Sequence, residues 1–210
     1  MKMFPYQEDA FNSIKDHEYA AIFHEQGLGK SKIAIDLILY WVQKEILDTV
    51  LLVAKKMLLH NWENEIRQHS HLNPRILTQN LKSNYYIFNS PCRVILANYE
   101  MLIKEQSRIA LLLDTRDIGI ILDESAKIKN PSSSLTKYFL EISQNFKRRI
   151  IMTGTPVANR PYDIWSQVNF LDGGKSLGKD FKTFKKNTDL TSELSNDEDA
   201  RVDFENKISE

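Results

Sequence analysis

The sequence predicts an α/β fold with a mainly parallel sheet and helices on both faces. Short apolar runs alternate with longer segments of helical periodicity, which is typical of β-α-β units. Several runs contain only aliphatic residues and glycine, as expected for strands that are buried on both faces. The 210 residues are enough for one such core with a small appendage.

Each predicted strand is a short run rich in aliphatic residues. The expected strands cover residues 20–23, 50–54, 75–78, 93–97, 118–122 and 149–152, with a weaker candidate at 85–88. Polar residues follow the carboxyl ends of most of these runs. Because ligands gather at the carboxyl ends of parallel strands, the sequence predicts a single active face.

The predicted helices lie between these strands. They cover residues 7–15, 30–44, 57–69, 99–113, 132–144 and 162–171. The run Asp172-Gly173-Gly174 then predicts a turn. We therefore expect a domain of residues 1–172, followed by a segment of residues 173–210 that is first rich in Lys and Phe and then acidic.

Composition argues against several classes of protein. The 28 basic and 28 acidic residues cancel, so any surface for nucleic acid must be a local patch. Cys92 is the single cysteine, which predicts a structural thiol in a reducing, intracellular compartment, cytoplasmic or, in a eukaryote, nuclear. No apolar stretch reaches membrane-spanning length, the N-terminus does not resemble a signal peptide, and the histidines do not form a metal set.

Residues 24–31, His-Glu-Gln-Gly-Leu-Gly-Lys-Ser, join the first predicted strand to a helix. Gly27 and Gly29 can adopt positive φ, so backbone N–H groups can surround phosphate oxygens at a helix N-terminus. Lys30 can reach the β- and γ-phosphates, and Ser31 can offer its hydroxyl to Mg²⁺. A usual phosphate loop has Gly in place of His24, so an ordinary strand-to-helix turn is the alternative. The expected nucleotide-binding set here is Gln26, Gly27, Leu28, Gly29, Lys30, Ser31 and Lys32.

Asp123 and Glu124 follow the apolar run at 118–122. A carboxylate at the end of a buried strand is costly unless it has a partner, and hydrated Mg²⁺ is a natural one. We expect Asp123 to hold that ion and Glu124 to orient or deprotonate an attacking water, with Lys30 as the other catalytic residue. The alternative is an acidic pair that only caps the next helix. Together with the glycine loop, the pair predicts a nucleoside-triphosphate site.

Further sequence blocks occur in a fixed order around these two motifs. The full series is Pro5-Tyr6-Gln7, residues 25–31, Leu58-Leu59-His60-Asn61-Trp62, Asn98-Tyr99-Glu100, residues 123–130 and Thr153-Gly154-Thr155-Pro156. In this order the blocks resemble the Swi/Snf-type DNA translocases of helicase superfamily two. The resemblance implies a three-layer RecA-like P-loop NTPase fold and the N-terminal motor lobe of an ATP-dependent double-stranded DNA translocase. It also implies ATP and Mg²⁺ as ligands, double-stranded DNA as a partner, and a second RecA-like lobe in the same full-length chain.

The resemblance also assigns roles to individual residues. Gln7 resembles the glutamine that recognises adenine, since a side-chain amide can donate and accept at once. Thr153, Gly154 and Thr155 resemble the motif that couples hydrolysis to lobe movement. Trp62 is expected in the core rather than as a stacking platform for bases. The residues expected to contact the DNA backbone, without reading sequence, are Lys55, Lys56, Asn98, Tyr99 and Lys127.

The chain departs from the family pattern at three points. Ala126 stands where many relatives carry His, so it cannot offer that side chain to Thr153, which puts tight coupling in question. Lys55-Lys56 stands where a Pro-Lys pair is common. The 210 residues include no second lobe and hence no arginine finger, so we expect the isolated chain to fold but to be nearly inactive.

Other functions remain open at this point. The chain could belong to the motor of a restriction or phage system or to an RNA helicase, or it could be a nucleotide-binding scaffold without motor activity. The segment 175–186 carries five lysines around Phe181 and Phe184. It suits either an auxiliary DNA contact or an amphipathic segment that packs back onto the lobe.

Overall fold

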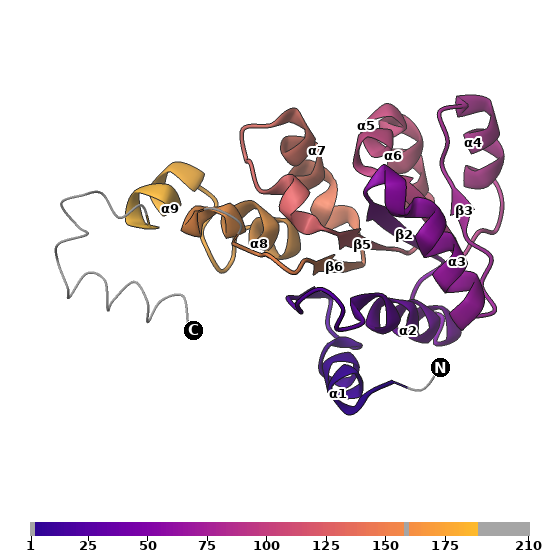
Figure 1. Cartoon of the computed structure of the whole chain (residues 1–210). Helices are drawn as coiled ribbons and strands as arrows, with labels where there is room; N and C mark the ends of the chain where they lie inside the picture. The colour runs from indigo at the N-terminus through magenta and orange to yellow at the C-terminus, as the bar shows by residue number, and fades with distance from the viewer. Residues whose placement is uncertain (1–2, 158–159, 189–210) are drawn as a thin grey trace.

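The computed structural model describes residues 3–157 and 160–188 of the chain. Its centre is a six-stranded sheet in the order β1-β6-β5-β2-β4-β3, and each neighbouring pair is parallel (Figure 1). This confirms the predicted α/β fold with a parallel sheet. The strands are β1 (Tyr19–Ile22), β2 (Thr49–Ala54), β3 (Arg75–Ile76), β4 (Val94–Asn98), β5 (Ile118–Asp123) and β6 (Arg148–Met152).

Helices cover both faces of this sheet, as Figure 1 shows. One layer contains α1 (Pro5–Ile14), α2 (Lys30–Gln43) and α3 (Leu59–His69). The other contains α4 (Leu81–Phe88), α5 (Tyr99–Lys104), α6 (Gln106–Thr115), α7 (Ser134–Ile142) and α8 (Trp165–Asp172). The remaining elements are the 3-10 helices η1 (Lys56–Leu58), η2 (Ser125–Ile128), η3 (Ser143–Asn145) and η4 (Pro161–Ile164), and helix α9 (Phe181–Thr188).

Alternate residues of the central strands point into the two layers. In β2, Leu51 and Val53 pack toward α5 to α8, whereas Val50 and Leu52 pack toward α2 and α3. All four side chains are fully buried. Burial of such a side chain contributes about 1.5–3 kcal/mol, so both faces of the strand must be apolar. This explains why β2 is a continuous apolar run rather than an alternating one.

The predicted strand at 85–88 is wrong, because these residues lie in α4. The helix begins where the side chain of Asn80 accepts hydrogen bonds from the N–H groups of Lys82 and Ser83. A short apolar run has no clear period, so this N-cap decides between strand and helix. The neighbouring strand is shorter than predicted, because the Thr78 N–H donates to Asn84 Oδ1 instead of extending the β3 ladder.

The predicted helix at 99–113 is two helices. Glu105 interrupts it with φ −103° and ψ 17°, so α5 ends and α6 begins there. Glu105 is nevertheless buried, and its carboxylate accepts hydrogen bonds from Asn84 Nδ2 at 2.6 Å and Arg108 at 2.7 Å. The Glu105 carboxylate therefore joins Asn84 of α4 to Arg108 of α6.

The segment after α8 begins with the predicted turn. Gly173 has φ +69° and caps α8, and the Asp172 carboxylate accepts from the N–H groups of Gly174 and Ser176. Phe181 of α9 then packs on Trp165, with ring centroids 5.3 Å apart. Phe181 therefore packs back onto the lobe, as expected if the segment 175–186 is amphipathic. The acidic stretch at 189–205 lies outside the described residues.

Candidate active site

The strand register brings the predicted motifs to one edge of the sheet. Met152 at the end of β6 is paired with Ile22 of β1 on one side and with Asp123 of β5 on the other. The loop that follows β1 and the loop that follows β6 are therefore neighbours, and Asp123 lies beside them. Figure 1 shows the N-terminal end of α2 at this edge.

The glycine loop has the backbone that its sequence predicts. Gly27 and Gly29 have φ values of +85° and +69°, and Gly29 is the N-cap of α2. Lys30 Nζ donates to the carbonyl oxygens of His24 at 2.7 Å and Glu25 at 3.0 Å. The ammonium group is therefore held across the loop rather than extended into solvent.

Gln7 lies directly on this loop. Its side chain is buried, its Nε2 donates to Leu28 O at 3.3 Å, and its Oε1 accepts from the Phe4 N–H at 3.0 Å. A Cβ added to Gly29 would lie 2.1 Å from Gln7 Nε2, so the Gln7 amide occupies the space that a side chain at position 29 would need. Tyr6, which is half-exposed beside it, donates its hydroxyl to Leu28 O.

The Asp123 carboxylate is half-buried at the carboxyl end of β5. Its Oδ2 accepts a hydrogen bond of 2.9 Å from Trp62 Nε1. Burial raises the pKa of Asp123 above its usual 3.8, while the Trp62 hydrogen bond and the charge of Lys30 oppose that rise.

Trp62 and Tyr99 each donate a hydrogen bond to Asp123. Trp62 is a core residue, as predicted, but its indole N–H also holds the carboxylate. The Tyr99 hydroxyl donates to the Asp123 carbonyl oxygen at 2.8 Å. Sequence reasoning missed both roles. The only feature of the sequence that could have indicated these roles is that Trp62 and Tyr99 each lie in a block that resembles the Swi/Snf-type family.

Glu124 has an unusual backbone. Its φ of +55° and ψ of 52° lie in the left-handed region, which costs a residue with a side chain about 1–2 kcal/mol. Such conformations are concentrated at functional sites, where the surroundings enforce them. The Glu124 carboxylate is half-buried, with Oε2 3.9 Å from Lys55 Nζ.

The loop after β6 contacts the glycine loop. Thr153 is fully buried, and its Oγ1 accepts from the Thr155 N–H at 3.1 Å. A Cβ on Gly154 would lie 3.5 Å from the backbone nitrogen of Gln26 and 3.6 Å from His24 O. Gly154, one of the three residues predicted for coupling, therefore lies against the predicted phosphate loop.

Three lysines predicted to contact DNA surround one hollow of about 600 Å³, which is lined by Lys55, Lys56, Met57, Tyr99, Glu100 and Lys127. Met57 is 83% exposed at its rim. Lys127 Nζ lies 3.3 Å from Glu100 Oε1, so this lysine has an acidic neighbour.

Asn98 and Tyr99, which are also predicted to contact DNA, have buried side chains. Asn98 is buried, and its Oδ1 accepts from the Met101 N–H at 2.8 Å, which caps α5. Tyr99 is 1% exposed, and its hydroxyl is used by Asp123. Both polar groups bond within the protein, because Asn98 caps α5 and Tyr99 is the first residue of that helix.

The remaining predicted residues lie around the first turn of α2. Lys32 forms an ion pair with Asp36 along the helix. Ser31 is half-buried, and Gln26 and Leu28 are exposed in the loop. Lys30 and Ser31 thus form the start of α2, next to the glycine loop, whereas the charge of Lys32 is paired within α2.

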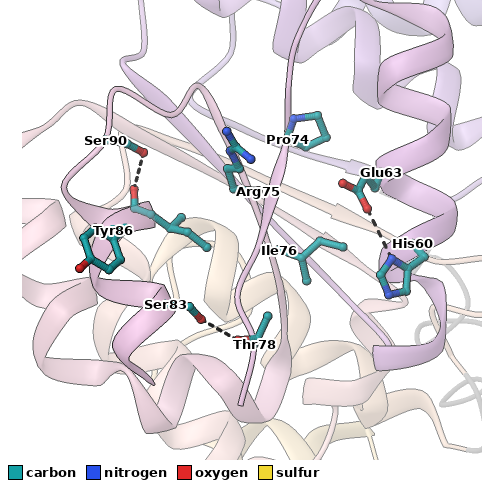
Figure 2. A pocket seen from close by; sticks show the side chains of 10 residues that line it. His60, Glu63, Pro74, Arg75, Ile76, Thr78, Ser83, Tyr86 and Ser90 are labelled. Atoms are coloured by element: carbon teal, nitrogen blue, oxygen red, sulfur yellow. Dashed lines mark hydrogen bonds and ion pairs between the residues drawn. The ribbon is translucent and has the colours of Figure 1, made fainter. Parts of the chain in front are cut away.

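A second hollow of about 560 Å³ lies at the edge strand β3 (Figure 2). Two pairs of its polar side chains contact each other: His60 Nδ1 lies 3.4 Å from Glu63 Oε2, and Thr78 Oγ1 lies 3.0 Å from Ser83 Oγ. None of the predicted site residues lines it. The predicted site residues lie elsewhere, at the carboxyl ends of strands β1, β6 and β5.

Within residues 3–157 and 160–188, no cluster of three or more His, Cys, Asp or Glu is arranged to hold a metal ion. His69 and His71 therefore form no such group with other residues of this part of the chain. Cys92 is buried, and burial raises the pKa of its thiol. In the same described part of the chain, no helix has the length and apolar character needed to cross a membrane.

Comparison with known proteins identifies the family. The family described as SNF2-related domain matches residues 14–207. The ISWI chromatin-remodeling complex ATPase ISW1 of Saccharomyces cerevisiae is 30% identical over 179 residues, which cover 80% of this chain and 15% of that protein. The probable ATP-dependent DNA helicase CHR12 of Arabidopsis thaliana is 31% identical over 158 residues, which cover 70% of this chain and 14% of that protein.

A solved structure matches the whole chain. The Sulfolobus solfataricus SWI2/SNF2 ATPase core in complex with dsDNA superimposes with a TM-score of 0.81 at 25% identity, covering 100% of this chain and 43% of that one. A second solved structure, the Sulfolobus solfataricus SWI2/SNF2 ATPase core domain, gives a TM-score of 0.76 at 25% identity, covering 100% of this chain and 42% of that one. The chain therefore spans less than half of the solved core and a small part of its curated relatives. It belongs to the SNF2-related family, and its fold is the N-terminal ATPase lobe of a SWI2/SNF2 core.

Proposed function

We propose that this lobe binds ATP·Mg²⁺ and part of a duplex DNA backbone as the first half of an ATP-driven double-stranded DNA translocase. The observation that carries the proposal is the register that pairs Ile22 with Met152 and Met152 with Asp123, which puts the glycine loop and the acidic pair at one sheet edge. Lys30 is held across a loop with two left-handed glycines, and Asp123 is a half-buried carboxylate at that edge. An acidic pair that only capped the next helix would not need the glycine loop at the same edge.

The residues present fit the proposed ligands. The Asp123 carboxylate and the Ser31 hydroxyl would hold Mg²⁺, which typically takes one or two protein oxygens and completes its shell with phosphate and water. Bound Mg²⁺ would supply positive charge to the phosphates as hydrolysis proceeds. Lys30 would exchange its two carbonyl partners for phosphate oxygens, and Gln7 would present its amide to the adenine edge.

Glu124 is proposed as the general base. Its carboxylate would orient the attacking water and take up its proton. The left-handed backbone turns the side chain away from the strand direction, where an extended residue would continue β5. The loop of Thr153, Gly154 and Thr155 would register loss of the γ-phosphate because it contacts the glycine loop.

DNA would cross the hollow bounded by Lys55, Lys56 and Lys127. Lysine contacts to phosphate position a protein on DNA without reading its sequence. We propose that the buried Asn98 and Tyr99 support this surface rather than contact DNA with their side chains. A second lobe, within the part of a SWI2/SNF2 core that this chain does not span, would face the site and supply an arginine.

The test is Lys30→Ala, with Lys44→Ala as a matched control at the other end of α2. Lys30→Ala should abolish ATP·Mg²⁺ binding in calorimetry with little change in melting temperature, because the half-buried lysine contacts only two carbonyl groups of its own loop with its ammonium. Lys44→Ala, which removes an equal charge from an exposed position, should bind as the parent does. Undiminished affinity in Lys30→Ala would remove this lysine from the site.

DNA-stimulated turnover of the full-length protein separates the motor from the scaffold alternative. A motor should hydrolyse ATP faster when duplex DNA of any sequence is added. Stoichiometric ATP binding without DNA-stimulated turnover would favour a nucleotide-binding scaffold. Stimulation by RNA alone would favour an RNA helicase.

A further inference from the structure

A buried glutamine joins the acidic box to the loop after β6. Gln167 of α8 is fully buried and forms three hydrogen bonds. Its Oε1 accepts from Ser125 Oγ at 2.7 Å, and its Nε2 donates to Pro156 O at 2.8 Å and to Asp163 O at 3.1 Å. The amide therefore uses its acceptor on one functional loop and one of its donors on the other.

The chemistry of these partners specifies glutamine. One side needs an acceptor for a hydroxyl, and the other needs donors for two carbonyl groups. An apolar side chain of similar size would leave the Ser125 hydroxyl and the Pro156 carbonyl without this partner in the interior, which is costly. An ionised Glu would place a carboxylate against two carbonyl oxygens. A position that served packing alone would favour an apolar residue.

The connection begins next to Glu124. Ser125 follows Glu124 directly, and it is itself fully buried. Because a left-handed glutamate persists only where its surroundings enforce it, an anchored neighbour helps to hold that conformation. The position of the Glu124 carboxylate therefore depends on where Gln167 holds Ser125.

The other end of the connection reaches the coupling loop. Pro156 follows Thr155, and Gly154 of the same loop lies against the glycine loop. Ala126 offers no polar side chain for a direct link between the acidic box and Thr153. The link through Ser125 and Gln167 supplies a connection that Ala126 cannot make.

We propose that Gln167 is a positioning residue for ATP hydrolysis, which fixes Glu124 relative to the loop of residues 153–156 and carries movement between them. This rests on the proposed function of the lobe. Gln167 contacts neither nucleotide nor DNA in this arrangement; it acts through Ser125 and Pro156.

The test uses the full-length protein with Gln167→Met and Ser125→Ala. Gln167→Met should lower DNA-stimulated kcat about 10- to 100-fold, the scale of misplacing a reacting group by a fraction of an ångström to one ångström. The KM for ATP and the affinity for duplex DNA should stay within about 3-fold of the parent, because no binding residue is changed. Combining the two substitutions should cost little more than Gln167→Met alone, since both break the same link.

Ser166→Ala is the matched control. Ser166 is as buried as Gln167 in α8, and its hydroxyl donates to Lys129 O at 3.2 Å, outside residues 153–156, so Ser166→Ala removes one hydrogen bond of the same helix. This variant should keep parental kcat. Gln167→Glu adds a chemical signature, because a protonated carboxyl can donate one bond to a carbonyl. Its kcat relative to the parent should rise as pH falls.

The outcomes separate the two proposals. If the parent shows no DNA-stimulated turnover, the proposed function is overturned, and the role of Gln167 in it falls too. If the parent is stimulated and Gln167→Met has parental kcat, only the Gln167 assignment is overturned. An equal loss in Ser166→Ala, or additive losses in the double variant, would reduce Gln167 to a packing residue and also overturn the assignment.

Discussion

Replacing Gly29 by Ala tests the contact between α1 and the glycine loop. Alanine in the left-handed conformation at φ +69° costs about 1–2 kcal/mol. The new Cβ would also lie 2.1 Å from Gln7 Nε2, so the amide must move and lose its hydrogen bonds to Leu28 and Phe4. At about 0.5–1.5 kcal/mol for each bond, the clash adds about 1–3 kcal/mol.

Gly27→Ala is the matched comparison. Gly27 also has positive φ, at +85°, but nothing lies within 4 Å of its would-be Cβ. It should therefore cost only the backbone term of about 1–2 kcal/mol. The difference between the two variants is about 1–3 kcal/mol, which corresponds to about 2–12 °C in melting temperature at 2–4 °C per kcal/mol for a domain of this size.

The assay is thermal unfolding of both variants, together with the relative affinity for ATP and GTP by calorimetry. Gly29→Ala should melt below Gly27→Ala and lose preference for adenine, because Gln7 is displaced. In a Gln7→Ala background the extra cost of Gly29→Ala should disappear, since the clash partner is gone. Equal melting temperatures for the two glycine variants would refute the close contact of Gln7 with this loop.

Three further predictions concern the acidic pair and the DNA surface. Burial raises the pKa of Asp123 above 3.8, so the native state holds this proton more tightly and its ionisation lowers stability as pH rises from 3.8 through the raised pKa. Asp123→Asn should therefore raise the melting temperature at neutral pH, by less as pH falls, while weakening Mg²⁺-dependent ATP binding; a lower melting temperature at neutral pH would contradict this. Glu124→Gln in the full-length protein should keep ATP bound and cut turnover at least about 10²-fold, measured by steady-state ATPase, and normal turnover would place water activation elsewhere. Replacing Lys55 and Lys56 together by Gln should weaken binding to unrelated duplexes alike and reduce the slope of log K against log salt by about 1–2, whereas an unchanged slope would place both lysines off the DNA track.

Local patterns predicted much of this site. Gly27 and Gly29 precede a helical apolar pattern, and Asp123 ends an apolar run, so neighbouring residues alone indicate the loop and the strand end. The parallel arrangement then places both motifs at the same edge, because ligands gather at carboxyl strand ends. Short apolar runs are harder to assign. The run 85–88 is too short to show a helical or strand period, and the Asn80 N-cap starts the helix that contains it.

The sequence by itself determined the α/β class, the two nucleotide motifs and the family, because each depends on residues close together in the chain or on their order. Only the tertiary structure decided how these motifs are supported. The Trp62 bond to Asp123 spans 61 residues, and the Ser125 bond to Gln167 spans 42. Such pairs depend on how helices pack across the sheet, and helical periodicity shows which face is buried without showing which distant polar group it meets. The burial of Tyr99 beneath the lysine hollow has the same cause.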